Sequence, residues 1–204
     1  MANGLSVVCL DLEGVLVPEI WIGVAKTTGI EKLMLTTRDI PDYDRLMQGR
    51  IAILNEHKLT LLDIQNVIAA IDPLPGALDF LEGLRAKTQV VILSDTFTEF
   101  ARPLMQKLRW PTLFCNTLTV DNANMITGYR LRQPDGKTKA VAALKSIGFR
   151  VVAAGDSYND VGMITTADAG IFFKPPASIT REYPAIPVAN DYTVFMRMLS
   201  EKLG

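Results

Sequence analysis

Three features are scarce in this sequence of 204 residues: cysteine, net charge and long apolar runs. The two cysteines, Cys9 and Cys115, lie in short apolar runs, so we expect buried free thiols in a reducing compartment rather than a disulfide. A formal net charge of -1 gives no electrostatic reason to expect nucleic acid as a partner. Every apolar run stops short of the roughly 18 residues that a membrane span needs, so no membrane-spanning segment is expected. The first ten residues lack the basic segment and apolar core of a signal peptide, which predicts a cytoplasmic protein.

Hydrophobic residues are plentiful, at 49%, and short apolar runs alternate with helical spacing along most of the chain. A chain of this size suits one large domain, or a core domain with a smaller insertion. Continuous apolar runs predict strands covered on both faces at 6–10, 88–95, 149–157 and 168–173. Helical spacing predicts helices over 77–87, 97–108, 137–147 and 159–167. This alternation predicts an α/β fold with a doubly wound parallel sheet, a Rossmann-like core.

Two segments depart from the alternation of strand and helix. Residues 18–72 carry helical spacing and hold no convincing strand before the Pro-Leu-Pro-Gly turn at 73–76. We therefore predict a helical cap over 18–72, inserted into an α/β catalytic core formed by 1–17 and 73–204. The second segment, 118–131, has two short apolar runs around Asp-Asn-Ala-Asn, which predicts a β-hairpin.

Acidic residues follow two of the predicted strands. Asp11 and Glu13 come directly after the first strand, and Asp156 and Asp160 come after the third. The carboxyl ends of parallel strands line one crevice, so we expect these acids to converge there. Carboxylates this close repel one another unless a cation joins them, and oxygen-only ligands favour Mg²⁺.

Other polar residues expected at the same edge of the sheet suit a phosphate. Ser94 ends the second predicted strand, and Lys137 begins a predicted helix. A hydroxyl and an ammonium can bind the non-bridging oxygens of a phosphoryl group, and a carboxylate can act as the nucleophile. The residues alone do not decide which acid is the nucleophile. Lys139 and Lys145 also compete with Lys137 for the cationic role.

Four motifs occur in one order: Asp-Leu-Glu-Gly-Val at 11–15, Ser94, Gly-Lys at 136–137 and Gly-Asp-Ser-Tyr-Asn-Asp at 155–160. This set resembles the haloacid dehalogenase-like phosphatases, and the resemblance covers essentially the whole chain. The insertion after the first motif is similar to the first type of cap in that family. The chain is most similar to the phosphoserine phosphatases, and among them to the bifunctional type that also acts as a phosphoserine:homoserine phosphotransferase. That type likewise has Glu where most relatives have the second Asp of the first motif.

The resemblance implies a role for each motif residue. Asp11 attacks phosphorus, and Glu13 protonates the leaving alkoxide and then deprotonates the attacking water or alcohol. Mg²⁺ is held by Asp11, Asp156 and residue 13, where the family usually uses the main-chain carbonyl. The other motif residues bind or support the phosphoryl group: Ser94, the Asp95 N–H and Lys137 as its ligands, Asn159 lining the site, and Asp160 orienting Lys137 or the metal shell.

Substrate choice is expected to come from the predicted cap. An amino-acid head group needs an anion for its ammonium and a fork of donors for its carboxylate, and Glu19 and Arg50 supply one of each. The phosphoserine phosphatases that the chain resembles use a Glu and an Arg at similar places. The resemblance therefore implies O-phospho-L-serine as the substrate, with homoserine as a second acceptor of the phosphoryl group.

Several alternatives stay open at this point. Ser94 can cap the following helix instead of binding phosphate, and Asp160 can be structural rather than catalytic. A non-enzymatic phospho-acceptor module also clusters acids, a hydroxyl and a lysine around Mg²⁺, although such a module has no use for a cap. A capped phosphatase for another small phosphomonoester, such as a sugar phosphate, would not need Arg50 and Glu19.

Overall fold

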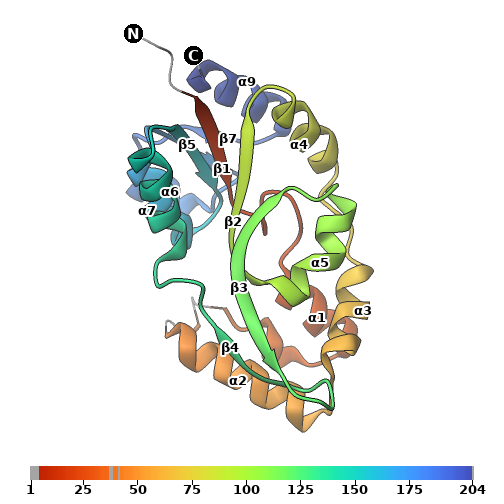
Figure 1. Ribbon diagram of the computed structural model, residues 1–204. Coiled ribbons are helices and arrows are strands. Elements are labelled where there is room, and N and C mark those ends of the chain that lie inside the picture. Colours follow the sequence, from red (N-terminus) through yellow and green to blue (C-terminus); the bar gives the residue numbers. More distant parts are fainter. Residues whose placement is uncertain (1–4, 37–38, 41, 204) are drawn as a thin grey trace.

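A computed structural model describes residues 5–36, 39–40 and 42–203 (Figure 1). Its strands are β1 Ser6–Leu10, β2 Gln89–Phe97, β3 Thr112–Val120, β4 Ile126–Arg130, β5 Arg150–Gly155, β6 Ala169–Phe173 and β7 Val188–Ala189. They form one sheet in the order β4-β3-β2-β1-β5-β6-β7. Neighbouring strands are parallel except for β3 and β4. The predicted doubly wound α/β fold is confirmed.

Helices cover both faces of the sheet. On one face lie α4 (Ala77–Arg85), α5 (Thr98–Lys107) and α9 (Tyr192–Leu203), and on the other lie α6 (Gly136–Ser146), α7 (Val161–Thr166) and α8 (Ala177–Glu182) (Figure 1). Alternate residues of the central strand β1 point to opposite faces of the sheet. Val8 and Leu10 pack on the face covered by α4, α5 and α9, and Val7 and Cys9 pack on the face covered by α6, α7 and α8. Burial on both sides explains why β1 is apolar throughout rather than alternating with polar residues.

The segment predicted as a cap is helical. It contains α1 (Ile20–Thr28), the short 3₁₀ helix η1 (Glu31–Met34), α2 (Tyr43–Glu56) and α3 (Leu61–Ala69), and no strand lies in its described residues. Its two ends meet, because the Leu74 N–H donates to the Leu16 carbonyl at 2.9 Å. Residues of α1, α2 and α3 pack into the same hydrophobic cluster as α4 and α5, so the segment shares its apolar interior with one layer of the sheet. The division into cap and core stays a prediction.

The predicted hairpin at 118–131 corresponds to β4 and the second half of β3. Its tip reaches the helical segment: the Asn124 carbonyl and side chain accept from the Leu61 and Leu62 N–H groups, both at 2.8 Å. Asn55 of α2 also donates to the Ile126 carbonyl at 3.1 Å. The first half of β3 pairs in parallel with β2, which the sequence analysis did not predict. None of the helices in the described part of the chain combines the length and apolar character needed to cross a membrane.

Candidate active site

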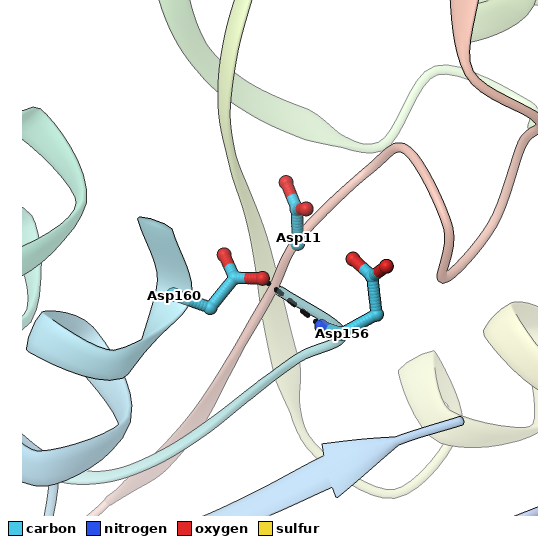
Figure 2. Close-up of side chains that lie close together, drawn as sticks. All are labelled: Asp11, Asp156 and Asp160. Carbon is cyan, nitrogen blue, oxygen red and sulfur yellow. Dashed lines mark hydrogen bonds between the residues drawn. The ribbon is translucent and has the colours of Figure 1, made fainter. Parts of the chain in front are cut away.

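Three acids of the first and last motifs meet at the carboxyl ends of β1 and β5 (Figure 2). Asp11 directly follows β1, and its N–H donates to the Ala154 carbonyl of β5 at 2.9 Å. Asp156 follows β5, and Asp160 ends the short 3₁₀ helix η2 (Tyr158–Asp160). One carboxylate oxygen from each acid lies within 4.8 Å of the others. The convergence expected from strand order is therefore present in the structure.

Two glycines allow the acids to approach, and the sequence analysis gave neither a role. Gly14 has φ of +76°, and a Cβ at this position would lie 2.5 Å from Cγ of Asp156. A Cβ at Gly155 would overlap the carboxyl group of Asp160. Any side chain at Gly14 therefore meets both a backbone penalty and a clash with an acid of the site. The signal for both was their position inside the acidic motifs.

Lys137 joins the cluster from the first turn of α6. Its Nζ donates to Oδ1 of Asp11 and to Oδ1 of Asp160, both at 2.8 Å, and its side chain is 4% exposed. Of the two competing lysines, Lys139 is exposed, and Lys145 pairs with Asp168 at 3.0 Å. Geometry therefore singles out Lys137 as the cation beside the acids.

Asp160 is engaged by protein groups on both of its oxygens. Oδ1 accepts from Lys137, and Oδ2 accepts from the N–H groups of Asp156 and Ser157, each at 3.0 Å. Figure 2 shows the bond from the Asp156 N–H to Asp160. Asp160 thus fixes both the lysine and the backbone that carries Asp156. This arrangement supports the orienting role that the resemblance implied.

The charges in this cluster do not balance, because three carboxylates share one ammonium. Burial raises the pKa of Asp11 well above its usual value, and the negative charge of Asp160 adds to that effect. Burial, together with Asp160, raises the pKa of Asp156 to about 7. Burial alone would lower the pKa of Lys137, but the charges of Asp11 and Asp160 outweigh it and raise that pKa. A divalent cation bound here would relieve the excess negative charge.

The donor set fits Mg²⁺, which prefers oxygen ligands. Oδ1 of Asp11 accepts from the Leu12 N–H and from Lys137. Within the described residues, no hydrogen bond from another residue occupies Oδ2 of Asp11 or the carboxylate of Asp156. These oxygens are free to bind a cation or, in the case of Asp11, to attack an electrophile.

Glu13 lies apart from the three aspartates. Its Oε2 accepts from the Ile20 N–H at 2.7 Å, at the start of α1. Burial raises the pKa of Glu13 to about 8, and the nearby charge of Glu19 contributes. Glu13 therefore holds a proton near neutral pH, as a general acid must. Its carboxylate is bound to the start of α1, and the place of residue 13 among the metal ligands, through its side chain or its main-chain carbonyl, stays a prediction.

The end of β2 is held by two residues that sequence reasoning missed. The Asp95 carbonyl accepts from the Tyr43 hydroxyl at 3.2 Å and from Nδ2 of Asn116 at 3.1 Å. The Asp95 carboxylate accepts from Nδ2 of Asn159 at 3.0 Å. Ser94, 6% exposed, lies one residue earlier, and its hydroxyl accepts from the Thr96 N–H at 3.2 Å. Tyr43 and Asn116 carry no sequence signal, because their partners are distant along the chain.

Arg50 and Glu19, the two residues proposed to bind the substrate head group, both belong to the helical segment. Arg50 of α2 is 8% exposed, and burial lowers its pKa to about 10, so it stays charged at neutral pH. Glu19 is exposed and precedes α1 without capping it through its side chain. Its charge contributes to the raised pKa of both Glu13 and Asp156, so the Glu19 carboxylate lies close enough to the proposed active site to act on its acids.

Comparison with known proteins agrees with these motifs. The profile of the haloacid dehalogenase-like hydrolases matches residues 5–168. The phosphoserine phosphatase ThrH of Pseudomonas aeruginosa is 55% identical over 188 residues, which cover 92% of this chain and 92% of that protein. A phosphoserine phosphatase of Pseudomonas syringae pv. tomato is 54% identical over 92% of this chain and 79% of its own. The crystal structure of a phosphoserine phosphatase from T. onnurineus aligns with a TM-score of 0.73 at 23% identity, covering 96% of this chain and 94% of that one. At this identity the structural likeness shows the fold alone.

Proposed function

The chain belongs to the haloacid dehalogenase-like hydrolase family, and from that membership we propose that it is a Mg²⁺-dependent phosphoserine phosphatase working through a phosphoenzyme on Asp11. The observation that carries the proposal is the buried contact of Asp11 with Lys137, beside an oxygen of Asp11 that has no partner in the described residues. The names of the two relatives from Pseudomonas support phosphoserine as the substrate.

In the first half of the reaction, Oδ2 of Asp11 attacks phosphorus while the bond from phosphorus to the serine oxygen breaks. Lys137 and the Leu12 N–H hold Oδ1, which fixes the direction of the attacking oxygen. Glu13 gives its proton to the leaving alkoxide, and its pKa of about 8 suits that task. The Ser94 hydroxyl, the Asp95 N–H and Lys137 bind the phosphoryl oxygens. Asp11, Asp156 and residue 13 would hold Mg²⁺, which would neutralise the charge of the phosphoryl group when bound.

In the second half, Glu13 has lost its proton and acts as the base. It takes a proton from water, whose oxygen attacks phosphorus and frees Asp11 with release of inorganic phosphate. The same base can take a proton from an alcohol. We extend the proposal to transfer of the phosphoryl group to homoserine, following the bifunctional type that the sequence resembles. Water and homoserine then compete for one phosphoenzyme.

Recognition of the amino-acid head group is assigned to Glu19 and Arg50. Glu19 pairs with the substrate ammonium, and the Arg50 guanidinium pairs with its carboxylate. Both residues influence the pKa of Glu13, which supports their placement on the side of the leaving group. A phosphatase for another small phosphomonoester is the competing function, and it predicts no dependence on either residue.

Turnover of a panel of small phosphomonoesters tests the proposal. O-phospho-L-serine, sugar phosphates and an aryl phosphate are compared by kcat/KM in the presence of Mg²⁺, for the native chain and for Arg50→Ala. We expect phosphoserine to be preferred. Arg50→Ala should reduce phosphoserine turnover by about 10- to 150-fold, as the loss of a charge-assisted bond implies, and should affect the aryl phosphate far less. A preference for a sugar phosphate, or equal losses on both substrates, would refute the assignment of substrate. Absence of turnover on every compound would refute an enzyme altogether.

A further inference from the structure

The guanidinium of Arg50 lies over the ring of Trp21. Its Cζ is 4.5 Å from the ring centroid, within the range of a cation–π contact. The rest of its surroundings are poor in acceptors. Nη2 donates to the Leu35 carbonyl at 2.8 Å, and Nη1 contacts the Met47 sulfur at 3.7 Å. Nε is buried and has no hydrogen-bond partner among the described residues.

A buried cation of this kind is unusual, because guanidinium groups that leave water are normally paired with an acid. No carboxylate of the described residues lies within ion-pair distance of Arg50. A thioether sulfur is only a weak acceptor, and the guanidinium has five N–H donors to satisfy. The guanidinium therefore has no paired anion among the described residues, and the face of Trp21 contacts it beside the Leu35 carbonyl.

The position of Trp21 is itself fixed. Its ring meets Phe100 of α5 edge-on, with centroids 5.5 Å apart and planes at 71°. It also sits in the first turn of α1, next to two groups of the proposed active site. Ile20 donates its N–H to Glu13, and Glu19 is the residue before it. Three consecutive residues thus have different tasks: Glu19 carries an acid, Ile20 donates to Glu13, and the ring of Trp21 contacts Arg50.

Stacking and hydrogen bonding use different parts of a guanidinium. The ring of Trp21 takes one face, while the N–H donors point outward in the plane, where a planar carboxylate can pair with two of them. An aromatic ring stacked on the face of the guanidinium therefore orients its N–H donors and leaves them free to bind an acceptor. A purely apolar neighbour of the same size would exclude water but would not attract the cation.

We propose that Trp21 is a specificity-determining residue, which holds Arg50 in place for the carboxylate of an amino-acid substrate. The inference rests on the proposed function, because Arg50 is there the ligand of that carboxylate. Trp21 acts through Arg50 and touches no reacting atom. Its contribution should therefore appear only with substrates that carry a carboxylate, and it should vanish when Arg50 is absent.

Matched substrates and variants test this role. O-phosphoserine is compared with O-phosphoethanolamine, which keeps the phosphate and the ammonium but lacks the carboxylate. Trp21→Leu removes the aromatic face and keeps an apolar side chain, while Trp21→Phe keeps a smaller face. Trp110→Phe is the control, because Trp110 is 59% exposed and the aromatic ring that Arg50 contacts is that of Trp21. The melting temperature of each variant verifies that it is folded.

Trp21→Leu should raise KM for phosphoserine by about 2- to 30-fold, the range that a cation–π contact is worth. The kcat on both substrates and KM for phosphoethanolamine should stay unchanged, and Trp21→Phe should recover part of the loss. In an Arg50→Ala background, Trp21→Leu should have no further effect. Equal losses on the two substrates, or full additivity with Arg50→Ala, would show that Trp21 only packs and would overturn the proposal.

A readout without turnover separates this proposal from the proposed function. The chain has two tryptophans, so Trp110→Phe leaves Trp21 as the single tryptophan, whose emission can be excited apart from that of the tyrosines. Titration with phosphoserine should change its emission, phosphoethanolamine should not, and Arg50→Ala should remove the response. If phosphoserine is not hydrolysed but still gives an Arg50-dependent response, the proposed reaction fails and the role of Trp21 stands. If phosphoserine is hydrolysed but does not change the emission of Trp21, the proposed role of Trp21 is wrong and the proposed reaction stands.

Discussion

Nζ of Lys137 lies 2.8 Å from Oδ1 of Asp11, although the two residues are 126 positions apart in the sequence. Both side chains are almost fully buried, so the contact is formed in a region from which water is excluded. A pair of this kind is strongly oriented, and removing Lys137 would leave Asp11 and Asp160 as buried carboxylates without their cation. The geometry of the proposed nucleophile is therefore set by the fold before any substrate binds.

Asp11→Asn should abolish turnover while the fold is retained. The amide oxygen can still accept from the Leu12 N–H and from Lys137, but a neutral amide is a poor nucleophile. Phosphate release and trapping of a phosphoenzyme with labelled phosphoserine measure the loss, and circular dichroism verifies the fold. A labelled enzyme intermediate in this variant would exclude Asp11 as the nucleophile.

Removal of divalent cations should stop catalysis and lower stability together. Chelator leaves three carboxylates sharing one ammonium, whereas Mg²⁺ bound to the native state adds about 2.7 kcal/mol at a concentration of 100 times Kd. Ca²⁺ should be a poor substitute, because it prefers a larger and looser shell of ligands. The melting temperature is followed with and without Mg²⁺ for the native chain and for Asp156→Asn, which should respond weakly. Full activity in excess chelator would contradict the prediction.

Glu13→Gln should suppress hydrolysis and transfer to the same degree. If Glu13 is the base for both acceptors, its replacement leaves neither water nor homoserine with a group to take the proton. The amide can still accept from the Ile20 N–H, so the start of α1 should be preserved. Labelled phosphoserine with excess homoserine is followed for phosphohomoserine and free phosphate. Loss of one product without the other would show that the base is not shared.

Gly14→Ala and Gly29→Ala form a matched pair of variants. They separate the effect of left-handed backbone strain from that of a clash between the new Cβ and Asp156. Their φ values are +76° and +73°, so each alanine should destabilise the fold by about 1–2 kcal/mol through the left-handed backbone. Only at Gly14 does the new Cβ meet Asp156, because no described residue lies within 4 Å of the corresponding position at Gly29. Urea unfolding should show at least as large a loss for Gly14→Ala as for Gly29→Ala, because Asp156 must also move, and Mg²⁺-dependent activity should fall only for Gly14→Ala. Equal activity in both would argue that the position of Asp156 is not critical.

Asp168→Asn should weaken the fold near neutral pH but not in acid. Burial alone would raise the pKa of Asp168, but the Val151 N–H and Lys145 outweigh it and lower that pKa below its usual range. A lowered pKa contributes stability above the unfolded value of about 3.9, and this stability is lost as pH falls through the folded value. The pair is partly exposed, so the difference at pH 7 should be under about 1 kcal/mol and should shrink in high salt. Urea unfolding from pH 7 down to pH 3 measures it, and a constant difference at every pH would contradict the prediction.

The elements of the sheet that depend on local pattern were predictable. The apolar runs at β1, β2, β5 and β6 mark strands buried on both faces, and the acids at their ends follow from strand direction alone. The first half of β3 was missed, because its pairing with β2 is set by a long-range register rather than by a local pattern. The C-terminal β7 has only two residues, too few to show any periodicity.

In the proposed active site, residue type and motif order predicted the acids. Many of the other contacts of the site depend on tertiary packing and could not be predicted from the sequence. Three lysines lie on one predicted helix, and the Gly-Lys motif at 136–137 favoured Lys137; the rotation of α6 against β1 then places its Nζ beside Asp11. Trp21, Tyr43 and Asn116 act on partners that lie far away along the chain, so no spacing rule could pair them. Such contacts are available only once the sheet has brought the segments together.

The hydrogen bond from the Leu74 N–H to the Leu16 carbonyl joins the two ends of the helical segment at one point beside the sheet. Because the chain leaves and rejoins the sheet at neighbouring positions in space, the strands on either side can keep their register when the length of the segment between them changes. Related proteins can therefore keep the same sheet and the same acids while they differ in this segment. A different segment would then change which substrates are accepted. The hairpin tip at Asn124 is the second place where a transplanted segment would have to be matched. Grafting experiments between relatives should thus treat the segment and the β3–β4 hairpin as one unit of exchange.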